Sequence, residues 1–220
     1  MPMPVLMLSA YEVENEKPCA MLAVWGGISN EKELTITVAS ERHTLKGILA
    51  RQAFVVSMGT VETATECDYL GITKGDKVAD KFEKSGFHTT KSEFVDAPLI
   101  DELPFAVECR VKSYNPETWR LVGEIVNVSL DESILGENGK VSFDKFHPLA
   151  FDWMNKIYLS LGEKVGNAYG WAGVKVKKRL TSQIPKACWK HAILITPHSQ
   201  CGAMGAVRQL RAEGTLLHNR

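Results

Sequence analysis

Residues 38–49 read Val-Ala-Ser-Glu-Arg-His-Thr-Leu-Lys-Gly-Ile-Leu, and in this stretch a predicted strand ends and a predicted helix begins. The strand covers residues 34–38, where apolar and threonine side chains alternate as they do in a strand with one buried face. The helix follows over residues 43–52. A helix that opens directly after a strand presents its N-terminus at the end of the sheet, which makes this junction the first candidate for a binding site.

The residues around this junction are suited to a phosphate group. The N-terminus of a helix attracts anions through free backbone N–H groups and the positive end of the helix dipole. Two hydroxyl groups and two positive charges lie in the same stretch, and they belong to Ser40, Arg42, Thr44 and Lys46. A phosphomonoester needs such donors. The alternative is that Ser40 or Thr44 simply caps an ordinary surface helix.

The remainder of the chain contains many short segments of strand character and few of helical character. Predicted strands cover residues 4–8, 20–25, 53–57, 107–112 and 119–128, and Asn115-Pro116-Glu117 predicts a hairpin turn between the last two. On the first strand of that hairpin, Val107, Cys109 and Val111 share one face, and Glu108, Arg110 and Lys112 share the other. Predicted helices cover residues 61–69, 77–84 and 152–167, the last from apolar residues spaced three and four apart. This pattern predicts a mainly β protein, an antiparallel β-barrel with helical insertions.

A second candidate segment is Ala20-Met21-Leu22-Ala23-Val24-Trp25-Gly26-Gly27. An apolar strand that ends in tryptophan and two glycines lets the backbone come close to a flat ligand. A flavin ring, for example, needs a dry planar slot and backbone donors near one edge. The alternative is a core strand that bends at the two glycines.

Other motifs are weaker or missing. Residues 57–60 offer hydroxyl and N–H groups after a strand, and residues 66–71 carry an acid and an aromatic side chain. The sequence has no phosphate-binding glycine loop, nucleophile elbow or metalloprotease motif. Cys188-x-x-His191 and His198-x-x-Cys201 are separated by fewer residues than zinc-finger ligands usually are, so no metal site is expected.

Composition restricts the class of protein. The chain has 220 residues with 26 basic and 26 acidic side chains, which argues against a nucleic-acid binder. Neither a signal peptide nor a membrane span is expected, and five scattered cysteines suit a reducing compartment, so the sequence predicts a cytoplasmic protein. From residue 173 onward there are nine basic residues and one acidic residue. We therefore expect two regions: a domain at 1–172 and a basic C-terminal extension at 173–220 that is poorly packed on it.

In order and spacing, these segments resemble the flavin reductase-like family of FMN-binding split-barrel proteins, near flavoredoxin and the small flavin reductases. The central motif is Ser-x-x-His-Thr at residues 40–44. The resemblance covers about residues 3–170, and the segments that carry it are 21–27, 34–49, 53–57, 67–71, 80–87, 92–100, 121–128 and 161–168. Relatives usually have a proline pair where this chain has residues 30–33, and they end soon after residue 170, so the final fifty residues are unmatched.

The resemblance implies a six-stranded split barrel that forms a homodimer, with FMN in a groove near the dimer interface. Carried over to this chain, the ring would be lined by Ala23, Val24 and Trp25. The phosphate would be held by Ser40, Arg42, Thr44 and Lys46. Ser57 would touch the ribityl chain or the ring edge, and Asp68 and Tyr69 would border the pocket.

The function implied is that of an NAD(P)H-dependent flavin reductase, in which hydride passes from the nicotinamide to flavin N5 and no side chain acts as a catalytic residue. The first alternative is a flavoredoxin-like FMN electron carrier that a partner protein reduces. A second alternative is a protein on a related barrel that binds pyridoxal phosphate or haem. No nucleic acid or membrane partner is expected for any of the three.

Overall fold

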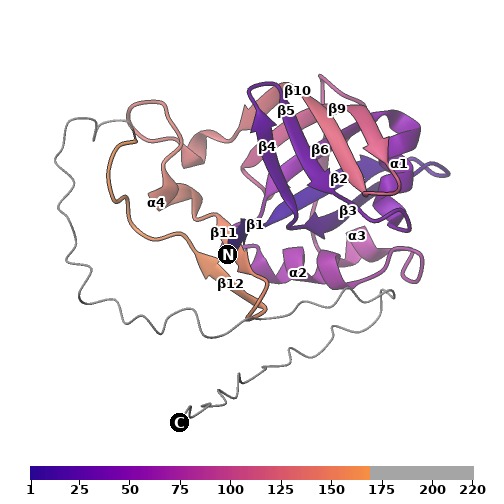
Figure 1. Cartoon of the computed structure of the whole chain (residues 1–220), viewed down its shortest axis with the longest axis horizontal. Coiled ribbons are helices and arrows are strands. Elements are labelled where there is room, and N and C mark those ends of the chain that lie inside the picture. Colours follow the sequence, from indigo (N-terminus) through magenta and orange to yellow (C-terminus); the bar gives the residue numbers. More distant parts are fainter. Residues whose placement is uncertain (169–220) are drawn as a thin grey trace, which may run out of the picture. The chain divides into compact units, whose positions relative to one another are not determined.

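The computed structural model describes residues 1–168 of the chain (Figure 1). The chain divides into two units, Met1–Lys164 and Val165–Arg220. The first unit carries every element described below. The predicted basic extension at 173–220 lies outside the described residues.

The main element of the first unit is a seven-stranded sheet in which every neighbouring pair is antiparallel. Its order is β3-β2-β6-β9-β10-β5-β4. The strands are β2 (Leu6–Tyr11), β3 (Pro18–Ala23), β4 (Gly26–Asn30), β5 (Glu33–Thr37), β6 (Ala53–Met58), β9 (Phe105–Asn115) and β10 (Arg120–Leu130). The sheet curls into a half-barrel, so the predicted mainly β class is confirmed. The sheet has seven strands, one more than the six that the resemblance implies.

Smaller elements surround this sheet. A three-stranded sheet joins β1 (Pro2–Pro4), β11 (Leu149–Asp152) and β12 (Ile157–Ser160), and a short ladder pairs β7 (Thr89–Lys91) with β8 (Pro98–Ile100). The helices are α1 (His43–Arg51), α2 (Ala64–Ile72), α3 (Lys81–Lys84) and α4 (Phe143–Phe146), with a short 3₁₀ turn at Glu132–Ile134. Helices α1, α2 and α3 all contact β3, and Figure 1 shows α2 and α3 together beneath that strand.

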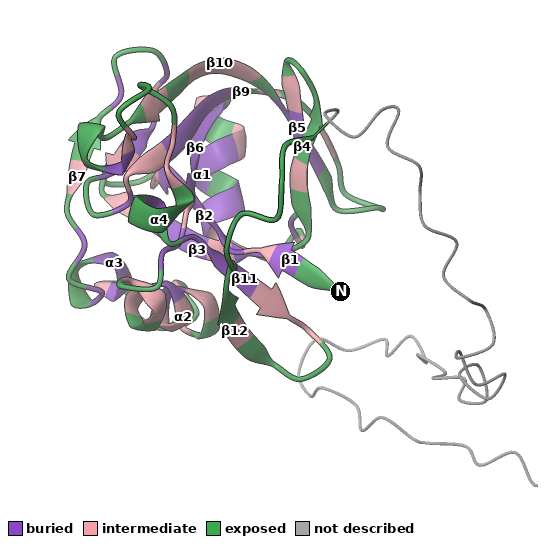
Figure 2. Ribbon diagram, turned by 90° about the vertical axis from the view of Figure 1, so that its left-hand side faces the viewer, coloured by how far each residue is buried: buried purple, intermediate pink, exposed green. Residues whose placement is uncertain are grey.

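The sheet has a core on each face. Alternate residues of β2 belong to different clusters: Leu6 and Leu8 lie in the core inside the half-barrel, whereas Met7 lies in the core under α2 and α3. This follows because successive side chains of a strand point to opposite faces. Helix α1 is buried on the side that faces the sheet and exposed on the other side (Figure 2).

Several sequence predictions are confirmed. On β5, Leu34 and Ile36 are buried while Thr35 and Thr37 are not, as the alternation predicts. Strands β9 and β10 form the predicted hairpin. Helix α1 begins at the predicted residue, His43.

The helix predicted at residues 152–167 is wrong. The structure has a hairpin of β11 and β12 there, and residues 161–168 have no regular structure. Asp152 builds the turn, because its carboxylate accepts hydrogen bonds from the Met154 backbone N–H at 3.0 Å and from the Asn155 side chain. Lys156 takes the left-handed conformation, with φ of 57°, which a helix cannot contain. Apolar spacings of three and four did not distinguish a helix from two short strands with apolar residues on both faces.

Two further predictions need correction. The predicted helix at 77–84 is only the single turn α3, and residues 73–80 form a loop; α2 begins at Ala64 instead of residue 61. Glu108, expected on a polar face of β9, is completely buried. Its carboxylate accepts hydrogen bonds from Ser92, Asn127 and Ser129, because the segment before β8 covers this face of the sheet.

Within residues 1–168, the helices are all too short or too polar to cross a lipid bilayer.

Candidate functional site

The N-terminus of α1 is open. Arg42 is the N-cap residue, with φ of −71° and ψ of 127°, and no side chain caps this end of the helix. Ser40 instead bonds through its hydroxyl to the Tyr114 hydroxyl at 3.0 Å, and Thr44 lies one residue inside the helix, almost fully buried. The alternative that Ser40 or Thr44 caps the helix is therefore wrong. The Leu45 N–H donates to the Arg42 carbonyl at 3.1 Å, so the N–H groups of His43 and Thr44 are the ones that remain for an anion at the positive end of the helix.

Strand β3 forms the floor beside this helix end. It is an edge strand of the main sheet, so one side of its backbone has no strand partner among the described residues. The Ala20 carbonyl is turned to that side, where it accepts a hydrogen bond from the Lys81 ammonium at 3.0 Å. In a strand the N–H and C=O of one residue point the same way, so alternate N–H groups of β3 face this edge, where α2 and α3 contact the strand and Ala20 is buried.

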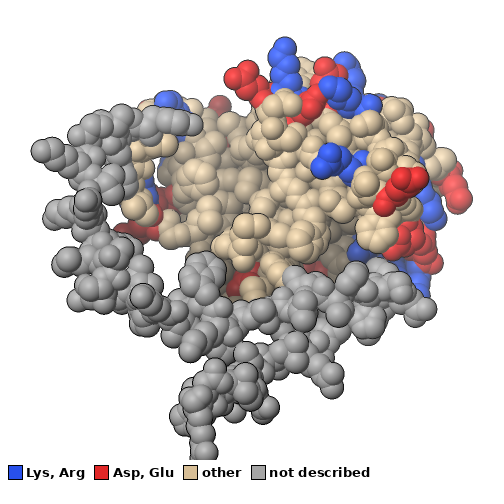
Figure 3. Space-filling view, in the orientation of Figure 1, with Lys and Arg blue, Asp and Glu red and all other residues tan. Residues whose placement is uncertain are grey.

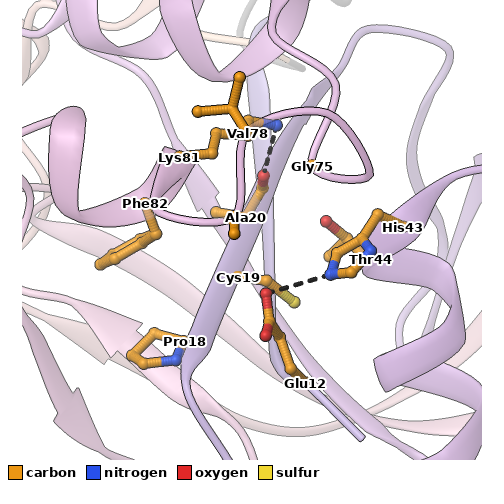
Figure 4. A pocket seen from close by; sticks show the side chains of 11 residues that line it. Glu12, Pro18, Cys19, Ala20, His43, Thr44, Gly75, Val78, Lys81 and Phe82 are labelled. Carbon is orange, nitrogen blue, oxygen red and sulfur yellow. Dashed lines mark hydrogen bonds and ion pairs between the residues drawn. The ribbon is translucent and has the colours of Figure 1, made fainter. Parts of the chain in front are cut away.

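Lys81 is a further candidate site residue, and no local sequence pattern indicated it. Its side chain is only 8% exposed, and it lines a small cavity with Thr44, Cys19 and His43 (Figure 4). Burial lowers the pKa of Lys81 to about 8, the Cys19 thiol opposes that shift, and nearby Arg42 adds to it. A buried ammonium close to a second cation is a strong attractor for an anion.

The predicted ring-lining residues lie at the end of the same strand. Ala23 and Val24 are buried, whereas Trp25 is 55% exposed and lies 6.3 Å from Trp153 between ring centroids. The Trp25 carbonyl accepts a hydrogen bond from the Thr37 backbone N–H at 2.7 Å. Because Thr37 ends β5, this bond brings Trp25 close to the segment that leads into α1.

The remaining predicted residues are more dispersed. Lys46 is exposed and pairs with Asp76, at 3.4 Å. Asp68 accepts a hydrogen bond from the Tyr158 hydroxyl at 2.7 Å, while Tyr69, next to it on α2, is half-buried against the core under that helix. The pKa of Tyr158 is raised above its ordinary value, mainly by burial and to a smaller extent by the Asp68 carboxylate.

Ser57 is fully buried on β6, and its hydroxyl has no hydrogen-bond partner. Strand β2 separates β6 from β3, so Ser57 lies two strands from the open edge. The structure thus places Thr44 beside Cys19 near the start of β3 and the Ala23–Trp25 segment at the other end of that strand, with α2 in contact with it. It does not bring Ser57 to that edge.

The comparisons with known proteins show the family of the chain. The model of the family described as "Flavin reductase like domain" matches residues 1–152. The chain belongs to the flavin reductase-like family. Among solved structures, this family member is similar to flavoredoxin of Desulfovibrio vulgaris (Miyazaki F), with 29% identity, a TM-score of 0.73, and coverage of 78% of this chain and 93% of that one.

Two further solved structures align with this chain over most of their length. Flavoredoxin from Methanosarcina acetivorans is 27% identical, with a TM-score of 0.70 and coverage of 78% of this chain and 91% of that one. An FMN-binding domain of a flavin reductase-like enzyme from Shewanella baltica OS155 is 17% identical, with a TM-score of 0.66 and coverage of 74% and 88%. The last likeness concerns the fold alone.

Proposed function

We propose that the protein is a cytoplasmic FMN-binding oxidoreductase, an NAD(P)H-dependent flavin reductase. The observation that carries the proposal is the open α1 N-terminus beside the buried Lys81 ammonium, at the free edge of β3. When bound, FMN would supply a ring that accepts hydride at N5, so the chain itself needs no nucleophile.

The residues around β3 fit a phosphorylated flavin. Arg42, Thr44 and Lys81 would hold the phosphate, with Ser40 and Lys46 at its outer side. The Lys81 ammonium has three N–H donors and makes one hydrogen bond to a protein group among the described residues, so it retains donors for an anion. The open edge of β3 would offer backbone donors to the ring.

A test of the phosphate assignment follows from the pKa of Lys81, about 8 in the ligand-free protein. A phosphate binds the protonated ammonium, so FMN affinity falls as pH rises above about 8, by up to roughly tenfold per unit. Isothermal titration between about pH 7 and pH 9.5 measures this. Lys81→Met flattens the profile, whereas Lys84→Met, on the exposed side of α3, leaves it unchanged. A wild-type profile that is flat across this range contradicts the assignment.

The ring position is tested at Trp25. Trp25→Ala weakens FMN and riboflavin by the same factor, roughly fivefold, because an aromatic contact contributes about 1 kcal/mol and does not involve the phosphate. Fluorescence titration with both flavins measures the two factors. Phe94→Ala, which removes another exposed aromatic ring, is the control. Unequal losses of FMN and riboflavin would contradict the placement.

A flavoredoxin-like electron carrier, reduced by a partner protein, is the second candidate. The likeness to flavoredoxin of Desulfovibrio vulgaris at 29% identity favours it. Anaerobic mixing with NADH or NADPH distinguishes the two: bleaching near 450 nm within seconds supports the reductase, and bleaching only with a protein donor supports the carrier. An absorption spectrum of the purified protein should be recorded first. Absorption bands of pyridoxal phosphate or haem, instead of those of a flavin, would contradict both proposals.

We also propose that the protein acts as a homodimer. In the orientation of Figure 1, charged side chains gather at the margins of the molecule and leave a largely uncharged face over β4, β1 and β11 (Figure 3). Exposed apolar residues of these elements, of β12 and of the adjoining segments include Ile28 and Ile157 in the strands, Trp25 just before β4 and Met154 in the β11–β12 turn. Apolar surface of this kind favours association, and sedimentation velocity tests it.

A further inference from the structure

His43 lies between two carboxylates from different parts of the chain. Its Nδ1 lies 2.9 Å from an oxygen of Asp76, in the loop between α2 and α3. Its Nε2 lies 3.1 Å from an oxygen of Glu12, in the turn between β2 and β3. The imidazole thus joins three segments: the first turn of α1, the β2–β3 turn and the loop at residues 73–80 (Figure 4 shows the contact with Glu12).

This arrangement distinguishes the two protonation states of the ring. A neutral imidazole has one N–H donor and one lone-pair acceptor, so it can donate to only one of the two carboxylates. An imidazolium donates at both nitrogens. The protonated ring therefore satisfies both contacts, while the neutral ring places a lone pair against a carboxylate oxygen on one side.

The other histidines in comparable ion pairs differ in this respect. His88 faces Glu102 at 2.7 Å and His147 faces Glu62 at 2.8 Å, each through one ring nitrogen. A single carboxylate can be satisfied by either protonation state of the ring. Among the described residues, the double contact is particular to His43.

The loop that His43 holds covers the Lys81 cavity. Gly75 lies directly on the imidazole, since a Cβ at that position would come within 3.0 Å of the ring. Gly75, Val78 and Ala79 line the cavity from the loop, opposite Cys19. Besides its contact with His43, the loop is tied by the Lys46–Asp76 ion pair at 3.4 Å and by short-range bonds, such as those from the Lys77 and Val78 N–H groups to the Lys74 carbonyl. Its attachment to α1 therefore depends on the contacts that His43 and Lys46 make with Asp76.

The charged groups around the imidazole come from every element packed near it. From α1 itself come Arg42 and Lys46, and Lys46 contacts the same Asp76 oxygen at 3.4 Å. Lys81 of α3 and the Cys19 thiol of β3 line the cavity beneath. Hydrogen bonding to His43 is the largest cause of the lowered pKa of Asp76, which keeps that carboxylate charged. Glu12 and Asp76 are the two groups in contact with the ring nitrogens.

We propose that His43 is a proton-controlled latch: its imidazolium form fixes the loop at residues 73–80 over the cavity, and loss of the proton releases the loop. Entry to the cavity is then favoured when the ring is neutral, because the neutral ring can donate to only one of the two carboxylates. The latch concerns the protein without ligand and does not depend on the proposed flavin function.

Cys19 is a natural reporter of the latch, because it lies under the loop and is only 6% exposed. The full-length protein is labelled with dithiodipyridine at about pH 5.5 and about pH 8.5, and the rate at Cys19 is followed by peptide mass spectrometry. Burial raises the pKa of the Cys19 thiol to about 12. The labelling rate at Cys19 in His43→Gln is divided by the rate in wild type at each pH. This ratio removes the intrinsic effect of pH on the thiol.

The ratio is expected to be about tenfold at the lower pH, where the wild-type latch is closed, and near one at the higher pH. Asp76→Asn, which also removes the Lys46 pair, should give at least the same ratio at the lower pH. His88→Gln should give a ratio of one throughout. A ratio equal at both pH values would overturn proton control, and a ratio of one at both would overturn the latch. Equal acceleration at the buried Cys67 and Cys109 would mean global opening, which also overturns it.

Discussion

Replacing Arg42 and Thr44 together with alanine is expected to weaken FMN binding by several kcal/mol. Each hydrogen bond between a charged partner and the phosphate contributes roughly 1.5–3 kcal/mol, and the double variant removes two side-chain donors beside the open end of α1. Riboflavin, which has no phosphate, should bind the double variant as it binds wild type. Titration of both flavins by fluorescence quenching measures the difference.

The matched control is Arg110→Ala with Thr90→Ala, which removes the same two residue types from exposed positions elsewhere on the domain. It should leave both affinities unchanged. Because Thr44 is buried, circular dichroism and the free energy of unfolding must show that the site variant is folded. A folded double variant that binds FMN as tightly as wild type would refute the phosphate site.

Gly47→Ala is expected to destabilise the fold by roughly 2–4 kcal/mol, although alanine is about 1 kcal/mol better than glycine inside a helix. The reason is that a Cβ at residue 47 would lie 2.3 Å from the Tyr11 carbonyl oxygen, a backbone atom that cannot move aside alone. Helix α1 packs so closely on β2 that only glycine fits at the contact. The clash therefore outweighs the gain in helix propensity.

Urea unfolding measures this change. Gly27→Ala is the control, because a Cβ there would meet nothing within 4 Å, and it should alter the free energy of unfolding by less than about 0.5 kcal/mol. Since Gly47 lies in the helix that carries Arg42 and Thr44, the destabilised variant should also lose flavin affinity. A Gly47→Ala protein as stable as wild type would show that α1 can move away from β2.

The parts of the fold that local patterns specify were predictable. The alternation in β5, the turn of the β9–β10 hairpin and the start of α1 each depend on residues close in sequence. Patterns failed where tertiary contacts decide the outcome. The β11–β12 hairpin depends on pairing of β11 with β1, about 150 residues away, and Glu108 is buried because a distant segment covers its strand.

The candidate site likewise contains residues that local sequence patterns indicate and residues that only tertiary contacts identify. Arg42 and Thr44 could be found because they stand at a recognisable strand-to-helix junction. Lys81 could not, because its hydrogen bond to Ala20 spans 61 residues, and its only local signal is a lysine beside phenylalanine in a short polar segment. The contacts of His43 with Glu12 and Asp76 span 31 and 33 residues, and neither acid stands out in the sequence.

The position of β3 at the border of the sheet has a consequence for handling the protein. A border strand with no strand partner on one side can recruit the same strand of another molecule once the helices that contact it, α2 and α3, move away, and such pairing is the usual first step of β-type aggregation. A coenzyme lying along that border would block such recruitment. Preparations saturated with flavin should therefore stay clear in storage longer than stripped ones, quite apart from any gain in folding free energy.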